Sequence, residues 1–326
     1  MKKTIFFALS CAFLISCGSK DSNTKNDLIL SNSSGNINTL LVVMPEEGWN
    51  GETGEVIREV FAAPVDGLPQ EEPLFSMSHI TPKTFSGFTK KSRIFLKIQQ
   101  AKTAGIESIV NKYAKPQQGF VITGPNKEAV HQLIKENGDK MIAAYKSTER
   151  SEKIRRVRKS LNDTEPLEEA LGITLKFPTA YRYAKQEDDF VWIRKEIPNG
   201  SMEILAYQIP YHRINKDSVV TSIIKMRDSI GAAHIPGPLE GSYMQTEKAF
   251  APYLFDANVA GRKAYETKGM WDVTNAFMAG PFVNYVIEDK EKDRYVVIEG
   301  FVFKPSAAKR DQIFELEAIL RSVVIQ

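Results

Sequence analysis

The chain has 326 residues, of which 42% are hydrophobic and 25% charged, and its formal net charge is +3. This composition excludes a fibrous protein, a disordered chain and a multi-span membrane protein, and a charge so near zero gives no reason to expect nucleic acid as a partner. The length suffices for one large domain or two modest ones, each with its own core.

The first 16 residues have the three parts of a bacterial lipoprotein signal peptide. A basic start, Met1-Lys2-Lys3, precedes an apolar run, Ile5–Ile15, which is too short to span a membrane. Leu14-Ile15-Ser16 then leads directly to Cys17, a pattern that resembles the lipobox. We therefore expect residues 1–16 to be removed and Cys17 to carry fatty acyl chains such as palmitate. These would hold the protein on a bacterial membrane, with the outer membrane favoured, facing the periplasm or the surface. A soluble secreted protein cut nearby is the alternative.

Cysteine usage agrees with this expectation. The chain has two cysteines, Cys11 in the expected signal peptide and Cys17 at the expected lipid site. The mature chain would then have no free thiol and no disulfide, which excludes a thiol nucleophile, a cysteine zinc site and an iron–sulfur cluster.

Residues 17–38 are expected to form a flexible tether. The segment is rich in Ser and Asn and has no aromatic residue, so it has little apolar surface to bury. The folded part is expected to comprise an N-terminal α+β subdomain with a linking helix over 39–162 and a C-terminal α+β subdomain over 163–326.

In the first subdomain the pattern predicts strands over 39–44, 94–98, 106–113 and 120–123, and a helix around residues 56–61. A helix is expected to start at Asn126 and to stop at Gly138, and a second helix is expected from 139 to 161. The second helix has a basic face, for which two interpretations stay open: a patch for phospholipid headgroups or acidic glycans, and a simple solvated surface. Its basic residues are Arg150, Lys153, Arg155, Arg156, Arg158 and Lys159.

The second subdomain is expected to be rich in strands. Runs at 173–177, 190–193, 202–207, 262–267, 283–287 and 295–303 predict strands, with a hairpin turn at Asn199-Gly200. Helices are expected from residue 218 to Gly231 and at the end of the chain. The predicted fold class is α+β: two mainly antiparallel sheet layers with helices packed on one face, and an internal duplication stays open as an alternative.

Large apolar residues beside Gly and Pro mark the candidate ligand site. Gly269-Met270-Trp271 and Gly280-Pro281-Phe282 predict an aromatic-walled groove, with Arg262 and Tyr285 as polar contacts, and Trp49 has similar surroundings. The alternative is that Trp271 and Phe282 anchor the core while Gly280-Pro281 forms a turn; we favour this packing alternative.

No catalytic or metal-binding motif is found. The four histidines are all more than ten residues apart, and neither a G-x-S-x-G elbow nor an H-E-x-x-H pair occurs. We therefore expect no metal and no cofactor.

Several short motifs carry a resemblance to a known family. These are Leu41-Val42-Val43-Met44, Trp49-Asn50-Gly51, the stretch 64–73, Gly269-Met270-Trp271, Gly280-Pro281-Phe282-Val283 and residues 297–302. They resemble an uncharacterised family of envelope lipoproteins of Bacteroidota-type bacteria, a domain of unknown function. The resemblance implies an envelope lipoprotein and brings no activity or catalytic residue.

Two functions remain in competition. We expect a non-catalytic, membrane-anchored module that binds an envelope glycan or a partner protein. The alternative is a carboxylate-dependent hydrolase or transferase acting on glycan or cell-wall material, which would need two carboxylates facing each other across a cleft, one of them with a raised pKa.

Overall fold

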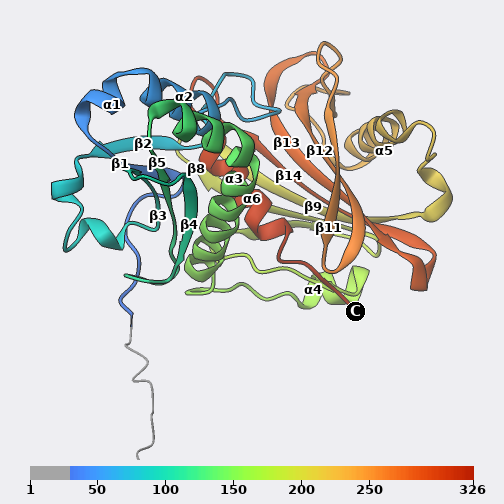
Figure 1. Cartoon of the computed structure of the whole chain (residues 1–326). Helices are drawn as coiled ribbons and strands as arrows, with labels where there is room; N and C mark the ends of the chain where they lie inside the picture. Colours follow the sequence, from blue (N-terminus) through green and yellow to red (C-terminus); the bar gives the residue numbers. More distant parts are fainter. Residues whose placement is uncertain (1–29) are drawn as a thin grey trace, which may run out of the picture.

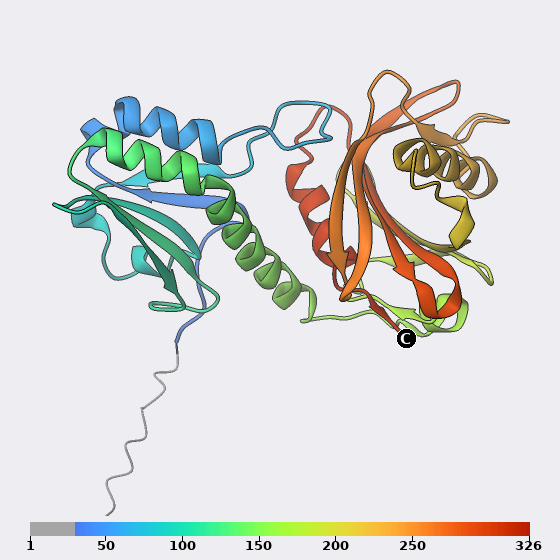
Figure 2. The same cartoon turned by 45° about the vertical axis from the view of Figure 1, so that its right-hand side comes forward.

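The computed structural model describes residues 30–326, which form two units side by side (Figures 1 and 2). The expected signal peptide, residues 1–16, and Cys17 lie outside the described residues. The N-terminal unit contains a five-stranded sheet and the C-terminal unit an eight-stranded sheet. Helices α3 (Lys127–Val157) and α6 (Arg310–Leu320) lie between the two sheets, and their residues contact each other (Figure 2). The predicted α+β class with two sheets is confirmed.

The five-stranded sheet has the order β2-β1-β3-β5-β4. Its pairs are parallel except for β4 with β5, whereas an antiparallel arrangement was expected. The run Leu40–Val43 is buried along its whole length, as in central strands of parallel sheets covered on both faces. The elements are β1 (Thr39–Val43), α1 (Glu46–Asn50), α2 (Glu52–Phe61), β2 (Ser76–Ile80), β3 (Ile94–Gln100), β4 (Gly105–Val110), β5 (Gln118–Gly124) and α3 (Lys127–Val157).

Helix α3 is one continuous helix where two were expected. Asn126 caps its start, because the Asn126 side chain accepts a hydrogen bond from Ala129 N at 3.0 Å. Gly138 does not end the helix. A Cβ on Gly138 would lie 2.6 Å from Val60 Cγ1, so the glycine lets α2 and α3 approach closely. A tertiary contact, and not a helix stop, explains this glycine.

The eight-stranded sheet is antiparallel throughout, with the order β10-β12-β13-β14-β9-β8-β7 and with β11 also paired to β12. A two-stranded sheet joins β6 to β15. The two large sheets differ in strand order and direction, so they are not copies of one unit. The elements are α4 (Glu165–Leu171), β6 (Ile173–Thr174), β7 (Arg182–Gln186), β8 (Phe190–Ile197), β9 (Gly200–Pro210), α5 (Val219–His234), β10 (Met244–Thr246), β11 (Tyr253–Val259), β12 (Arg262–Val273), β13 (Ala276–Asp289), β14 (Arg294–Phe303), α6 (Arg310–Leu320) and β15 (Val324–Ile325).

Helices cover both faces of this sheet, whereas one covered face was expected. On one face, which we call the α6 face, the sheet packs against α4 and α6. On the other, the α5 face, it packs against α5, which runs past Gly231 to His234. The expected hairpin joins β8 to β9, and its turn is Pro198-Asn199, one residue before the expected place, with Asn199 at a φ of 58° and Gly200 already paired with Ile197.

Gly280-Pro281 does not form the turn that the packing alternative placed there. Both residues lie within β13, and the reversal between β12 and β13 occurs at Thr274-Asn275, where Asn275 has a φ of 58°. A Cβ on Gly280 would lie 1.9 Å from Val302 O, so the neighbouring strand leaves room for glycine alone. The glycine therefore reflects close packing of strands.

The last part of the expected tether, residues 30–38, contacts the N-terminal unit. Ser34 N donates to Lys91 O at 2.9 Å, and Arg93 Nη2 donates to Gly35 O and Asn36 O at 2.9 and 2.8 Å. Asn38 N donates to Glu149 Oε2 of α3 at 3.2 Å. Ordered contacts therefore begin before residue 39.

Candidate functional site

A groove opens on the α5 face where the cover provided by α5 ends. We call it the aromatic groove; its volume is about 450 Å³, within the range typical of small-ligand sites. The loop that follows α5 forms one side, and strands β8, β9, β12 and β14 form the other. Its main lining residues are Trp192, Arg194, Glu203, Trp271, Phe301 and Phe303.

Strand alternation puts the polar residues of the groove on one wall. Trp192 and Arg194 are two positions apart on β8 and so point to the same face. In the β8–β9 hairpin Arg194 pairs with Glu203, so these two side chains are cross-strand neighbours. The register that follows from the Pro198-Asn199 turn thus builds this wall.

Glu203 is the buried acid of the groove. Its exposed fraction is 2%, and burial away from water raises the pKa of its carboxyl group. Trp192 Nε1 donates to Glu203 Oε2 at 2.8 Å, and Arg194 Nε lies 3.6 Å from Glu203 Oε1. The carboxyl group is therefore held in one position at the base of the groove.

Glu196 is a second carboxylate that lines the groove. It is exposed, and its hydrogen bond from Arg194 Nε, at 2.6 Å, lowers its pKa. Glu196 and Glu203 both lie on the β8–β9 wall, with Arg194 between them. A glycosidase needs its two carboxyl groups on either side of the scissile bond. The two carboxyl groups of this groove lie on one wall and do not face each other across it.

Trp271 lies on β12, on the same sheet face as Trp192 but four strands away from β8, and it is 2% exposed. Its ring packs edge-on against Phe301, with the ring centroids 5.2 Å apart. The indole Nε1 has no hydrogen-bond partner in the described part of the chain and lies beside Gly280. Trp271 is thus a core residue, as the packing alternative expected, whose edge also borders the groove.

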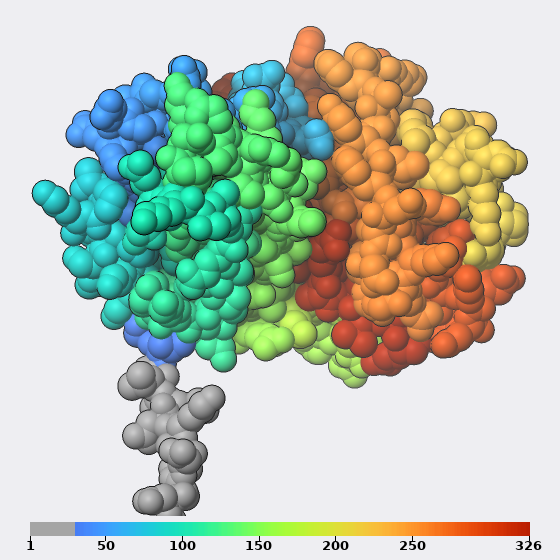
Figure 3. Space-filling view, in the orientation of Figure 1, coloured from blue at the N-terminus to red at the C-terminus, as the bar shows by residue number. Residues whose placement is uncertain are grey.

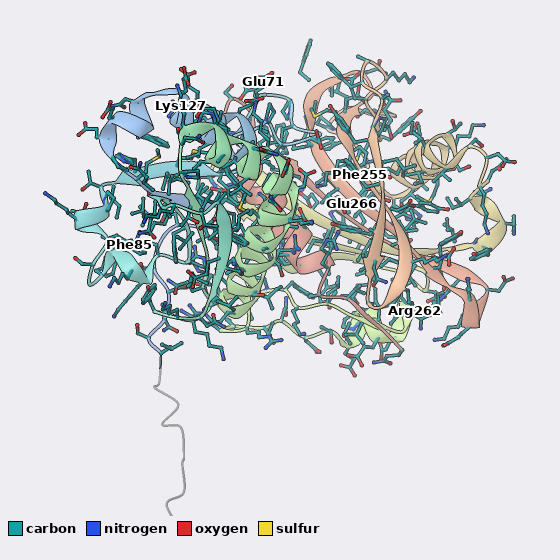
Figure 4. All side chains as sticks on the ribbon, viewed as in Figure 1. Glu71, Phe85, Lys127, Phe255, Arg262 and Glu266 are labelled. Atoms are coloured by element: carbon teal, nitrogen blue, oxygen red, sulfur yellow. The ribbon has the colours of Figure 1, made fainter. Side chains whose placement is uncertain are left out.

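The other predicted site residues do not join Trp271 in the groove. Phe282 is buried beneath Arg227, whose Cζ lies 3.5 Å from the ring centroid. Tyr285 is buried on the opposite, α6 face, where its hydroxyl accepts a hydrogen bond from Arg321 Nε at 3.0 Å. Arg262 is the first residue of β12, next to the turn from β11, and pairs with Asp289 at 2.7 Å (Figure 4).

Trp49 belongs to the N-terminal unit. It stacks on His79 with the ring centroids 5.1 Å apart, and Arg58 lies over its ring at 4.8 Å. Sequence reasoning missed Trp192 and Glu203. The signal that could have found them is the Asn-Gly hairpin, because its register places Arg194 directly across from Glu203.

A second hollow of about 600 Å³ lies at the carboxyl ends of β1, β3 and β5. The starts of α2 and α3 border it, and Lys127 Nζ pairs with Glu52 Oε2 at 2.6 Å (Figure 4 labels Lys127). Both side chains are exposed and neutralise each other. This hollow has no buried charged residue in its lining, so the aromatic groove is the stronger candidate.

Within residues 30–326, no group of three or more His, Cys, Asp or Glu is arranged to hold a metal ion. Among the described helices, none combines the length and the apolar character needed to cross a membrane.

Comparison with known families decides the relationship. Residues 160–322, half of the chain, match a domain of unknown function, DUF4837. The chain belongs to the DUF4837 family. Residues 33–158 match a second domain of unknown function, DUF8532. The expectation of an uncharacterised family is confirmed, while its Bacteroidota and lipoprotein character stay predictions.

A comparison with curated proteins found no match. Three similar solved structures each cover about half of this chain. LpqN, "involved in cell envelope biogenesis of Mycobacterium tuberculosis", is 12% identical and covers 47% of this chain and 82% of its own, with a TM-score of 0.29. The Ran-binding protein Mog1p of Saccharomyces cerevisiae is 10% identical over 47% of this chain and 89% of its own, with a TM-score of 0.31. Cyanobacterial PsbP of Synechocystis sp. PCC 6803 is 12% identical over 51% of this chain and 93% of its own, with a TM-score of 0.33. Scores this low do not establish a shared function.

Proposed function

We propose that this protein is a lipid-anchored lipoprotein of a bacterial cell envelope that binds an envelope glycan in the aromatic groove without transforming it. The observation that carries the proposal is the part of the groove formed by Trp192, Arg194 and Glu203, with Trp271 bordering the groove on the same sheet face. The proposed anchor is Cys17, on the strength of the signal sequence before it.

The chemistry of the groove suits a sugar ring. Indole rings offer a flat apolar surface with a polar edge, on which the C–H face of a sugar can pack. The carboxyl group of Glu203 can accept a hydrogen bond from a hydroxyl group, and Arg194 can donate to ring or hydroxyl oxygens. A peptide from a partner protein is the competing ligand, with an aromatic side chain in place of the sugar.

Titration of the intrinsic tryptophan fluorescence tests the binding. The probes are muropeptides released from purified peptidoglycan and oligomers of N-acetylglucosamine. We expect at least one probe to change the fluorescence in a saturable way, and Trp192→Ala to weaken that binding by at least about tenfold, since aromatic anchors dominate binding energy. Trp49→Ala, in the other unit, is the matched control and should bind as the parent does. Absence of any saturable change with the parent would reject the glycan proposal.

The same incubations separate binding from catalysis. Mass spectrometry should recover the probe unchanged after prolonged incubation. Cleavage that disappears in Glu203→Gln would instead establish the hydrolase alternative.

The anchor has its own test. Cys17→Ala should move the protein from the membrane fraction to the soluble fraction while leaving it folded, because Cys17 is where the acyl chains would attach. If this variant still sediments with membranes, the anchoring proposal is wrong.

A further inference from the structure

A second groove, distinct from the aromatic groove, lies between α3 and α6. We call it the basic groove; its volume is about 470 Å³. Figure 3 shows α6 recessed between α3 and the strands β11 and β12. The described residues that line the basic groove include no acidic side chain. Its basic side chains are Arg150, Arg155, Arg158, Lys176 and Arg321.

Carboxylates behind the groove hold three of these cations in position. Glu317 Oε1 lies 3.3 Å from Arg150 Nη1 and 3.7 Å from Arg321 Nε, so one carboxylate joins α3 to α6. Arg321 also donates to the buried Tyr285 hydroxyl at 3.0 Å. Arg155 Nε pairs with Glu152 at 2.7 Å. The guanidinium groups are therefore positioned before any ligand arrives, which lowers the entropic cost of binding.

The other two cations have no such compensation. Across residues 30–326, no carboxylate lies within 4.0 Å of Arg158 or Lys176, whereas the other three basic side chains of the groove are paired. Both side chains line the same hollow as the paired arginines. The groove thus carries an excess of positive charge in a concave site, which focuses the field on an anion.

We propose that the basic groove binds a phosphate ester. Four of its five cations are arginines, whose planar guanidinium groups match the oxygens of a phosphate in pairs. The hydroxyl group of Ser147 also lines the groove and can donate to a phosphate oxygen, whereas those of Ser151 and Ser322 already donate to backbone carbonyl groups, at 3.0 and 2.6 Å. A simple solvated helix face would not require Lys176 and Arg321, which come from outside α3, to converge on the same hollow.

The position of the groove suggests two sources for the phosphate. Arg156 of α3 donates to Gly35 O at 3.4 Å, so the first described residues pass beside the basic end of α3. The described chain begins at the same end of the molecule at which α3 ends (Figure 1). A phospholipid headgroup of the membrane that anchors the chain is therefore one source, and this source rests on the proposed anchor. A soluble phosphate ester is the other.

The test uses the full chain with Cys17→Ala, so that a lipid anchor does not contribute to binding. Arg158→Gln/Lys176→Gln removes the two uncompensated charges of the groove. The matched control is Lys90→Gln/Lys112→Gln, which removes two lysines that lie beside Tyr113 and outside the groove. These lysines are close in sequence to Lys91 and Lys115, whose backbones bond the first described segment. The melting temperatures of both variants should equal that of the parent, which shows that they fold.

Binding is measured with two kinds of probe. Sedimentation with vesicles of phosphatidylglycerol and phosphatidylcholine, against phosphatidylcholine alone, tests the headgroup. Calorimetric titration with glycerol phosphate tests the soluble ester. We expect the groove variant to bind at least about tenfold more weakly, because each basic residue near an anionic lipid surface contributes about fivefold. The control should keep most of the binding.

The outcomes separate the sources. Loss of vesicle binding in the groove variant alone supports the headgroup, and loss of glycerol phosphate binding in that variant alone supports the soluble ester. Equal weakening in both variants would show general basicity and overturn the proposal, as would the absence of binding to either probe. Fluorescence titration of the aromatic groove should be unchanged in the groove variant, so a failure here is distinct from a failure of the proposed glycan site.

Discussion

The two faces of the eight-stranded sheet are made by alternate residues of the same strands, but helices cover the two faces to different extents. On the α6 face, Tyr285 and its neighbours are covered by α4 and α6, and α6 is in turn bonded to the N-terminal unit. On the α5 face, α5 covers Phe282 and Val286, but its cover stops before Trp192 and Glu203. The groove therefore arises because helix α5 covers only part of this face, and not because any one strand is unusual.

The largest expected effect lies beneath α5, at the ion pair that fastens this helix to the sheet. Arg227 donates to both oxygens of Glu299, at 2.7 and 2.6 Å, and both side chains are 1% exposed. Arg227→Leu should lower the free energy of unfolding by about 3–5 kcal/mol, because it leaves a buried carboxylate without its partner. Urea unfolding measures this. The double variant Arg227→Leu/Glu299→Leu should recover part of the loss; a double variant less stable than the single one would contradict the explanation.

Next comes Trp271, at the border between the covered and the open part of the α5 face. Trp271→Ala should cost about 3 kcal/mol, at the lower end of the range for a buried tryptophan, because water in the adjoining groove can fill part of the cavity. Trp49→Ala should cost less, since Trp49 is partly exposed. The urea midpoint followed by circular dichroism compares the two variants. A midpoint equal to that of the parent for Trp271→Ala would mean that the ring is not a core anchor.

A smaller effect is expected on the α6 face, where the N-terminal unit caps α6. Glu72 accepts hydrogen bonds from Lys309 N at 2.7 Å and from Arg310 N at 2.9 Å, so a distant loop supplies the capping carboxylate of this helix. Glu72→Ala should cost about 1–2 kcal/mol, as the loss of a helix cap does. Thermal unfolding measures the loss, and the neighbouring Glu71→Ala is the control. Equal effects of the two substitutions would show that capping is not the cause.

The smallest expected effect is a gain in stability, from the substitution of Glu203. Burial raises the pKa of Glu203 in the folded protein above that of the unfolded chain, so its contribution to stability is present at acid pH and is lost as pH rises through the folded pKa. Glu203→Gln keeps an acceptor for Trp192 Nε1 and removes the buried charge. It should therefore stabilise the protein by about 1 kcal/mol at pH 8 and leave it unchanged at pH 4. Unfolding at both pH values measures this, and a loss of stability at pH 8 would contradict it.

Local patterns were sufficient to predict most elements and the fold class. The apolar runs of β1, β3 and β5 and the hairpin between β8 and β9 can be predicted because each is encoded within a few residues. What could not be predicted depends on partners distant in the sequence. Gly138 looks like a helix stop until Val60 is known to pack on it, and Gly280 looks like a turn until Val302 O is known to lie beside it.

The candidate site shows the same limit. The Gly and Pro residues around Trp271 mark it in the sequence, but the pattern around Trp192 and Glu203 does not show that they line a groove, because the groove exists only where α5 ends above the sheet. The strand pattern of β8 and β9 gives the order of side chains on a wall, but the length of a covering helix that follows later in the chain decides which part of that wall stays open. The basic helix face was visible in the sequence, whereas the contributions of Lys176 and Arg321 to the same groove were not.

The clamp on residues 35–38 has a mechanical consequence. Arg93 and Glu149, which pair with each other at 2.9 Å, bond this segment to β3 and to α3 before the chain enters β1. If the protein is held at Cys17, a pull on the tether first meets the backbone hydrogen bonds of residues 31–34 to Lys91 and Lys115 and then reaches this clamp, which shares the load between the sheet and the long helix. Because α3 also contacts α6, the tension spreads over both units, and strand β1 is shielded from being peeled out of its sheet.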